Sequence, residues 1–352
     1  MNTILVIGSG WGSSTFIKNI DTKKNKVIVI SPSKKFTYTP LLANNIKNNT
    51  NLTVDVSNLN KIKYIEDYVN DIKVNENTII TKNNKEYKYD YLILAHGADI
   101  NTFGIEGIKE NCYCIKTSDD ADYIRNKLNK LPNNSKIAVI GCGLTGSEII
   151  GNLIDYKKFN IYAIDGLNRP LISFSPKTSK FISNLWKNNG VNLRMNRFVS
   201  KVDNNSIYFK DNKINYDLAL WCGGIKVSPL SILINNVLNL NCKFGIPVNE
   251  YLKVENTKNV YAIGDCAYSG NPPTAQVASQ QGKYLANYFN NNFEGNEFKF
   301  KSKGQICYVG DGNSVYQNGN LMFKGKLTGY LNNFVHLYNS INFDQIINFL
   351  KK

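Results

Sequence analysis

The feature that most constrains this chain is a strand, a glycine turn, a helix and a second strand, an arrangement that occurs twice. The parts of the two copies correspond in order: Ile4–Ile7, Gly8 and Val27–Ile30 in the first, and Ile137–Ile140, Gly141 and Ile161–Ile164 in the second. A short apolar run that leads into glycine is typical of a strand buried in a parallel sheet. We therefore predict an α/β fold with two Rossmann-like dinucleotide-binding domains and a short C-terminal segment.

Composition agrees with this fold and restricts the partners. With 352 residues, 42% of them hydrophobic and 20% charged, the chain is long enough for about two globular domains. Its net charge of +15 favours an anionic partner, such as nucleotide phosphates, a phospholipid surface or nucleic acid. We expect no nucleic-acid partner, because no basic run with interleaved aromatic residues occurs in the sequence.

Cysteine and histidine usage argues against a metal centre. The seven cysteines are dispersed without a CxxC pair, and the only two histidines are His96 and His336. We expect reduced, mostly buried thiols and hence a cytoplasmic protein. No apolar run approaches the ~18 residues that span a bilayer. The chain opens on a strand at Thr3–Ile7, so we expect no signal or transit peptide.

The first glycine turn follows a strand and opens a helix, which predicts a dinucleotide site. Its first glycine permits the tight turn, its second lets the backbone approach a pyrophosphate, and the helix start offers free N–H groups. The next strand ends at Ser31, where an acid would normally bind the ribose hydroxyls. An accidental glycine turn is the alternative. The residues of this candidate site are Gly8, Gly10, Trp11, Gly12, Ser13 and Ser31.

The second glycine turn has all three glycines, and its second strand ends in Asp165. An acid at this position accepts both ribose hydroxyls and repels a 2′-phosphate, so it selects NADH over NADPH. The alternative for Asp165 is a solvated acid at a strand end. The predicted NADH residues are Gly141, Gly143, Leu144, Thr145, Gly146 and Asp165. Two dinucleotide sites in one chain imply a flavin and a nicotinamide that exchange electrons.

A third stretch supports the flavin. Val260–Asp265 predicts a buried strand that ends in Gly264-Asp265. In flavoproteins with two dinucleotide sites such an aspartate binds the ribityl chain, whereas the alternative is a plain turn at a strand end. Two further strand ends, Ala95-His96-Gly97 and Gly223-Gly224, are similar to the turns by which the chain crosses between such domains.

Taken together, these residues resemble the type II NADH dehydrogenases, which are single-subunit NADH:quinone oxidoreductases. The resemblance rests on Gly8–Gly12, Phe36–Leu42, Gly143–Gly151 and above all Pro272–Gln281, which is similar to the family's quinone-site motif AQxAxQ. It implies non-covalent FAD, NADH as donor and a quinone as acceptor. It also implies a C-terminal segment that attaches the protein to one membrane leaflet.

The resemblance implies domain boundaries and residue roles as well. FAD-binding parts are expected at 1–110 and 226–300, an NAD-binding domain at 111–225 and a membrane-associating segment at 301–352. Glu148 would lie beside the nicotinamide, although a helix acid that interacts with the dipole is an equal alternative. Gln276 and Gln280 would face the quinone, the alternative being a helix that only packs against FAD. The other residues assigned through the family are Thr39, Pro40, Ala95, Gly97, Ala275 and Gln276 for FAD, and Gly223, Gly224 and Glu148 for NADH.

Departures from the family pattern keep other functions open. Asn152 and Gln281 stand where the family has acids. A sulfide:quinone reductase remains an alternative because Cys307 lies where such enzymes have one of two cysteines, although no partner cysteine is evident. An NADH-binding flavoprotein of the apoptosis-inducing-factor type is another.

The C-terminal tail predicts two short amphipathic helices. Their apolar residues recur at i, i+3, i+4 and i+7: Leu331, Phe334, Val335 and Tyr338, then Phe343, Ile346, Ile347 and Leu350. Helices of this kind lie in the plane of the lipid headgroups, so we expect a peripheral membrane protein. The alternatives are a tail packed on the protein itself and a homodimer interface.

Overall fold

The computed structural model describes residues 1–332, which form two compact units. Unit 1 contains residues 1–37, 53–99 and 225–302, and unit 2 contains residues 38–52, 100–224 and, of the described C-terminal residues, 303–332. Strands β10 (Asp99–Ile100) and β18 (Ile225–Lys226) lie where the chain passes from one unit to the other. Each unit is therefore built from stretches that are far apart in the sequence.

A parallel five-stranded sheet forms the centre of unit 1. Its strands are β20 (Val260–Ala262), β9 (Tyr91–Leu94), β1 (Asn2–Ile7), β2 (Asn25–Ser31) and β5 (Lys63–Glu66), in this order. Leu5 and Ile7 pack on one face of the sheet, and Ile4 and Val6 pack on the other. Because both faces are covered, β1 is apolar from Ile4 to Ile7, as the sequence predicts.

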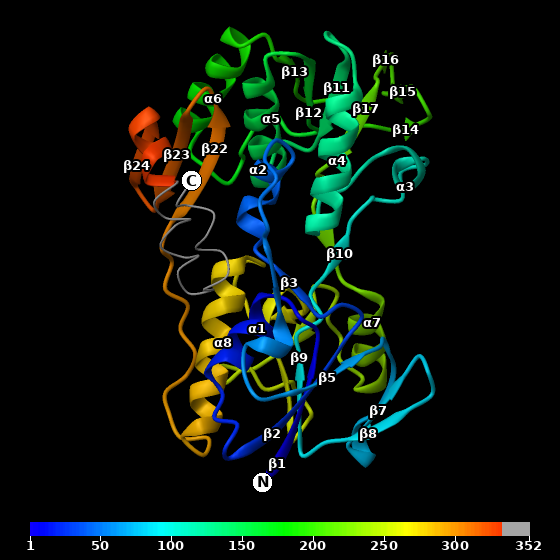
Figure 1. Cartoon of the computed structure of the whole chain (residues 1–352), viewed down its shortest axis with the longest axis vertical. Helices are drawn as coiled ribbons and strands as arrows, with labels where there is room; N and C mark the ends of the chain where they lie inside the picture. Colours follow the sequence, from blue (N-terminus) through cyan, green and yellow to red (C-terminus); the bar gives the residue numbers. More distant parts are fainter. Residues whose placement is uncertain (333–352) are drawn as a thin grey trace. The chain divides into compact units, whose positions relative to one another are not determined.

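Two helices lie side by side on one face of this sheet, α1 (Trp11–Asn19) and α8 (Ala275–Asn290) (Figure 1). They approach so closely that a Cβ on Gly282 would collide with the Gly12 carbonyl oxygen, so only glycine fits at this position. The remaining regular elements of unit 1 are α7 (Pro229–Val237), β3 (Lys35–Thr37) with β4 (Thr53–Asp55), β6 (Val69–Lys73), β7 (Thr78–Thr81) and β8 (Glu86–Lys88), β19 (Ile246–Pro247) with β21 (Ala267–Tyr268), and three short 3₁₀ turns, η2 (Val56–Asn58), η3 (Val74–Glu76) and η4 (Gly264–Cys266).

Unit 2 contains a second parallel sheet. Its strands are β13 (Asn192–Arg194), β12 (Asn160–Ile164), β11 (Lys136–Ile140) and β17 (Leu218–Trp221), in this order. Its other elements are η1 (Thr39–Leu41), α2 (Leu42–Asn45), α3 (Ile108–Asn111), α4 (Ser118–Lys130), α5 (Leu144–Tyr156), α6 (Pro176–Asn188), the antiparallel β14 (Lys201–Val202), β15 (Ser206–Tyr208) and β16 (Lys213–Asn215), and β22 (Gln305–Gly310), β23 (Asn313–Asn318) and β24 (Leu321–Gly325). The two parallel sheets confirm the predicted α/β fold.

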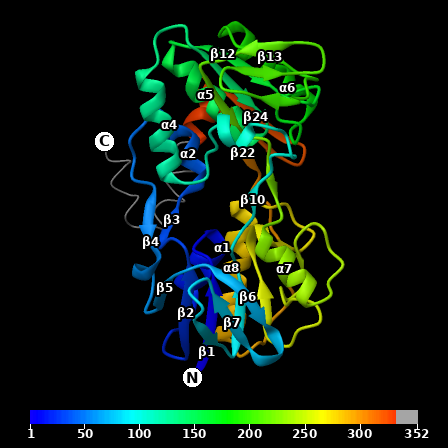
Figure 2. The same ribbon diagram turned by 90° about the vertical axis from the view of Figure 1, so that its right-hand side faces the viewer.

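The unit boundaries differ from the predicted domain boundaries at residues 100–110, which lie in unit 2 and not with the first FAD-binding part, and in two larger segments. Residues 38–52, expected in the first FAD-binding part, lie in unit 2, where α2 packs against α4 and α5 (Figure 2). The Arg125 guanidinium of α4 donates to the Asn45 and Asn48 carbonyl oxygens at 3.0 and 2.8 Å. These hydrogen bonds join segments that are remote in sequence, so no local pattern predicts them.

The second difference concerns residues 303–332, expected as part of a separate tail. They form the antiparallel sheet β22–β24, which packs on α5, and a helical stretch at 326–332. Leu331 belongs to this stretch, whereas the other residues of both predicted tail stripes lie outside the described residues. Within residues 1–332, no helix combines the length and the apolar character needed to cross a membrane.

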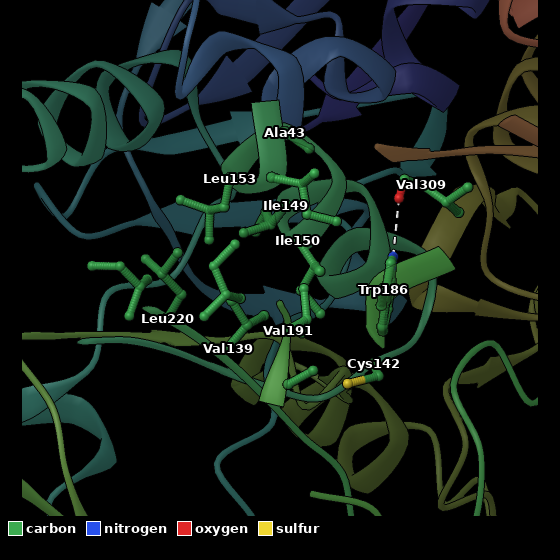
Figure 3. Close-up of a cluster of buried hydrophobic side chains, with 14 of the residues drawn as sticks. Ala43, Val139, Cys142, Ile149, Ile150, Leu153, Trp186, Val191, Leu220 and Val309 are labelled. Atoms are coloured by element: carbon green, nitrogen blue, oxygen red, sulfur yellow. Dashed lines mark hydrogen bonds between the residues drawn. The ribbon is translucent and has the colours of Figure 1, made fainter. Parts of the chain in front are cut away.

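Trp186 of α6 attaches the C-terminal sheet to the core of unit 2. Its side chain is fully buried, and its indole N–H donates to the Val309 carbonyl oxygen of β22 at 3.0 Å (Figure 3). Around it Val139, Ile150 and Val191 belong to the same apolar cluster. Trp186 thus contributes both apolar burial and a hydrogen bond that satisfies a buried carbonyl group.

We expect Trp186→Phe to lower the free energy of unfolding by about 2 kcal/mol, because it leaves the Val309 carbonyl group unpaired and removes packing volume. Urea denaturation of the purified protein measures this loss. The matched control is Lys187→Ala, at the exposed next position of α6, which should change stability by less than about 0.5 kcal/mol. Equal stability of Trp186→Phe and the unchanged protein would contradict this role.

Candidate dinucleotide-binding sites

The glycine turn of unit 2 joins β11 to α5, and each of its glycines has a different steric environment. Gly141 has φ +98°, and a Cβ there would collide with the carbonyl oxygen of Cys222, which follows the neighbouring strand β17. A Cβ on Gly146 would collide with the Gly141 carbonyl oxygen. At Gly143, in contrast, a Cβ would meet nothing within 4 Å among the described residues. The turn is therefore closed on its inner side and open at its second glycine, where a pyrophosphate would approach.

Helix α5 begins directly after this turn, with Gly143 as its N-cap. Glycine has no side chain with which to cap the helix, so the N–H groups of the first turn, which include those of Leu144 and Thr145, are available to an anion. One glycine turn thus brings together the predicted residues Gly141, Gly143, Leu144, Thr145 and Gly146. We call such a turn, with the N-terminus of the helix that follows it, a glycine cradle.

Asp165 folds back from the end of β12 over the same turn. Its Oδ2 accepts a hydrogen bond from the Cys142 N–H at 2.6 Å, and its Oδ1 accepts one from the Leu167 N–H at 2.8 Å. Each carboxylate oxygen has a second lone pair. Asp165 is therefore oriented by the backbone and can still accept hydrogen bonds from ribose hydroxyls.

The glycine turn of unit 1 repeats this geometry. Gly8 has φ +110°, and a Cβ there would collide with the Ala95 carbonyl oxygen, whereas Gly10 has open space within 4 Å among the described residues. Gly10 is also the N-cap of α1. Ser13 is fully buried in the third-glycine position. The Ser31 hydroxyl lies 3.1 Å from that of Ser9, which brings the end of β2 to the turn.

Helix α8 holds the second predicted flavin element of unit 1. The Gln281 side chain accepts the Gly264 N–H at 2.7 Å and donates to the Ser269 hydroxyl at 2.9 Å. This fully buried amide fixes the backbone immediately before Asp265. The sequence identified Gln281 only as a departure from the family pattern, because the partner of its side chain is a backbone group that no motif reveals.

The two predicted quinone residues lie four positions apart on α8, as expected for one helix face. The Gln280 amide, however, is hydrogen-bonded at both ends to Lys301: it donates to the carbonyl oxygen at 2.9 Å and accepts the N–H at 3.0 Å. Gln280 therefore fastens the segment that leads out of unit 1. The N-cap hydroxyl of α8, on Thr274, accepts the Val277 N–H at 3.3 Å, so this N–H of the first turn is already used.

Glu148 lines a cavity of about 400 Å³ within unit 2. The walls come from α2, α5 and the C-terminal residues, and include Asn44, Asn152 and Tyr308. Burial raises the pKa of the Glu148 carboxyl to about 8, so this group is mostly protonated at pH 7. Burial and the neighbouring Glu148 carboxyl also raise the pKa of the Cys307 thiol.

The cavity wall is held together by Asp155 of α5. Its carboxylate accepts the Tyr308 hydroxyl at 2.8 Å and the Asp311 N–H at 3.1 Å, and it lies 3.5 Å from the Lys47 ammonium group. Asp155 thus links three separate segments of unit 2. Sequence reasoning missed it, since a single acid in a helix has no distinguishing pattern.

The other predicted site residues lie in both units. Ala95 and Gly97 follow β9 in unit 1, and Ala275 is the first residue of α8. Thr39 and Pro40, also predicted for FAD, belong to unit 2. The remaining pair, Gly223 and Gly224, follows β17 in unit 2, and a Cβ on Gly223 would collide with the Trp221 ring.

The cradles fit the two cofactors that the sequence predicts. In each unit the turn is open only at its second glycine, and the helix behind it begins with an uncapped glycine. The donor set consists of backbone N–H groups with one oriented carboxylate in unit 2 and serine hydroxyls in unit 1. Such donors suit the pyrophosphate and ribose of a dinucleotide.

The Glu148 pKa predicts a pH-dependent stability. The carboxyl keeps its proton up to about pH 8 in the folded protein but loses it near 4.5 when unfolded. Stability should therefore fall as the pH rises through this window, by at most about 5 kcal/mol. In Glu148→Gln the side chain does not titrate, so the free energy of unfolding should vary less with pH, as measured by urea denaturation between pH 5 and 8.5. The control is Glu110→Gln at an exposed position. Parallel pH profiles for the unchanged protein and both variants would contradict the prediction.

Comparison with known proteins identifies the family. The sequence matches the pyridine nucleotide-disulphide oxidoreductase family over residues 2–282. A probable NADH dehydrogenase of Dictyostelium discoideum is 31% identical over 89% of this chain and 80% of its own length. A probable mitochondrial NADH-ubiquinone oxidoreductase of Schizosaccharomyces pombe is 28% identical over 82% of this chain. The chain spans 62% of the length of the latter and 59% of that of a Yarrowia lipolytica relative.

A solved structure agrees with these relatives. The NDH2 of Plasmodium falciparum in complex with NADH superposes with a TM-score of 0.87 at 26% identity, covering 96% of this chain and 94% of that one. The predicted resemblance is thereby confirmed. The chain belongs to the pyridine nucleotide-disulphide oxidoreductase family, within its type II NADH dehydrogenase branch.

Proposed function

We propose that this protein is an FAD-dependent NADH:quinone oxidoreductase that does not pump protons. The observation that carries the proposal is the pair of glycine cradles, one in each unit, of which only the second has an oriented ribose acid, Asp165. A chain with two cradles suits two different dinucleotides. The names of its relatives, NADH dehydrogenase and NADH-ubiquinone oxidoreductase, support the same assignment.

When bound, the flavin would supply the redox chemistry by which an electron pair moves from NADH to the quinone. The chain binds and orients these molecules. In unit 2 the first turn of α5 would hold the NADH pyrophosphate, and Asp165 would accept the ribose hydroxyls and repel a 2′-phosphate. In unit 1 the turn at Gly8 and Gly10 would hold the FAD pyrophosphate, with Ser31 at the ribose.

Asp265 would bind the ribityl chain, and Gln281 keeps its backbone in position. Glu148 would orient the nicotinamide as a neutral acid that can donate a hydrogen bond, since burial keeps it protonated. For the quinone we assign contact to Gln276. Gln280 would instead keep this end of α8 in place, because both ends of its amide are hydrogen-bonded to Lys301.

The sulfide:quinone alternative has less support. Such chemistry needs a pair of reactive cysteines, and all seven cysteines are free in the described structure. Cys307 is fully buried, and its thiol pKa is raised, which opposes the formation of a nucleophilic thiolate. An NADH-binding flavoprotein of the apoptosis-inducing-factor type would be reduced by NADH but would not be reoxidised by a soluble quinone.

We also propose that the protein is cytoplasmic and binds peripherally to one leaflet of a membrane. Its quinone would be dissolved in that membrane. Support comes from exposed apolar side chains gathered on β24 and the helical stretch after it. They are Leu321, Phe323, Leu327, Tyr330 and Leu331, exposed by 41 to 84%. A surface of this kind together with the net charge of +15 suits an anionic lipid surface. A homodimer formed through the same face is the alternative.

The function is tested with purified protein. It should carry an oxidised flavin absorbance that NADH bleaches and a soluble short-chain ubiquinone restores. NADPH should be at least tenfold less efficient in kcat/KM, since the Asp165 carboxylate repels the 2′-phosphate. Asp165→Ala should reduce the ratio of kcat/KM for NADH to that for NADPH. Asp265→Ala should lose bound flavin during purification. Bleaching without reoxidation by any quinone would leave a binding protein and refute the proposal.

Membrane contact is tested by flotation with anionic liposomes. The double variant Leu321→Asp with Leu327→Asp should float less than the unchanged protein but should reduce a soluble quinone equally well. Flotation should also weaken with added salt, because attraction between exposed charges is screened. Phe103→Ser, which removes another exposed aromatic side chain, is the control. If the double variant floats undiminished, this face is not the lipid contact.

A further inference from the structure

Phe198 stands out among the exposed side chains of unit 2. It follows β13 and is 75% exposed, whereas the next residue, Val199, is buried in the core. A single exposed phenylalanine is ordinary by itself. What distinguishes this one is its neighbour, because its ring packs on Gly166, the residue directly after Asp165.

The contact depends on glycine at position 166. A Cβ there would lie 2.6 Å from Cε1 and 2.8 Å from Cδ1 of the Phe198 ring. The Gly166 backbone is not in the left-handed region, so the position uses only the absence of a side chain. Glycine thus lets an aromatic ring lie against the backbone beside the ribose acid.

Backbone hydrogen bonds hold the ring's own loop in place. The Arg197 N–H donates to the Asp165 carbonyl oxygen and the Asn196 N–H donates to that of Leu167, both at 2.9 Å. In return the Asp165 N–H donates to the Arg194 carbonyl oxygen at 3.0 Å. Residues 165–167 and 194–198 therefore form one tied structure at the carboxyl end of β12.

We propose that the Phe198 ring stacks on the adenine base of NADH, and that exposed Leu167 forms the adjoining apolar surface. This rests on the proposed function, in which Asp165 binds the ribose that carries the adenine. Ligands of open α/β sheets bind at the carboxyl ends of the strands, where this ring lies. An exposed, pre-positioned aromatic ring next to the ribose acid supplies the flat surface that a purine requires.

The test separates the two halves of the dinucleotide. Isothermal titration of the oxidised holoenzyme measures Kd for ADP-ribose, which has the adenine but cannot reduce the flavin, and for nicotinamide mononucleotide, which lacks the adenine. Phe198→Ala should raise Kd for ADP-ribose about tenfold, in line with base–aromatic stacking. It should leave binding of the mononucleotide unchanged, and Phe198→Trp should keep ADP-ribose affinity.

Two further variants sharpen the result. Gly166→Ala should also weaken the binding of ADP-ribose, because the alanine methyl group displaces the Phe198 ring. In the double variant, Gly166→Ala should not raise Kd for ADP-ribose beyond the value for Phe198→Ala alone. The matched control is Phe244→Ala, which removes a 74% exposed ring from unit 1 and should leave both Kd values unchanged.

Three outcomes would overturn the assignment: unchanged ADP-ribose affinity in Phe198→Ala, an equal loss for both half-ligands, or full additivity with Gly166→Ala. Failure of the proposed function gives a different pattern, in which the unchanged holoenzyme binds neither half-ligand.

Discussion

Backbone packed directly against backbone at the two glycine turns is the contact on which the rest of the structure depends. A side chain on Gly8 or Gly141 would collide with a carbonyl oxygen at the end of the neighbouring strand, and one on Gly146 would collide with Gly141 itself. Because nothing but hydrogen fits there, each helix starts close above its sheet and its first N–H groups point to one place. At Gly10 and Gly143, in contrast, a side chain would meet no atom of the described residues within 4 Å.

The residue at the end of the second strand differs between the two glycine turns, an acid in unit 2 and a serine in unit 1. In unit 2 the carboxylate of Asp165 reaches back to the Cys142 N–H, so the charge is oriented toward the turn before any ligand arrives. In unit 1 the corresponding strand end offers the Ser31 hydroxyl, which pairs with Ser9. A carboxylate discriminates against a 2′-phosphate, whereas a hydroxyl does not. The difference therefore suits a nicotinamide site in unit 2 and a flavin site in unit 1.

The sequence predicts the parts of this fold that depend on local patterns. The strands at Ile4–Ile7 and Ile137–Ile140 are recognisable because both of their faces are buried, and the helix after each begins directly after the second glycine of the turn. The C-terminal sheet and the place of residues 38–52 could not be predicted, because contacts between distant segments decide them. The same limit hides the Gln281–Gly264 hydrogen bond and the ring of Phe198 on Gly166, where the partner is a backbone atom remote in sequence.

In the proposed function, helix α5 accommodates an anion at its N-terminus and an acid, Glu148, in its second turn. The helix dipole favours a charged acid near that end, but by only about 0.3–1 kcal/mol. Burial opposes the charge more strongly, since it raises the Glu148 pKa from 4.5 to about 8. Desolvation therefore prevails, and the helix presents a neutral carboxyl. A charged Glu148 would repel a pyrophosphate held at the first turn, so the burial that makes this acid neutral also preserves the anion site of the same helix.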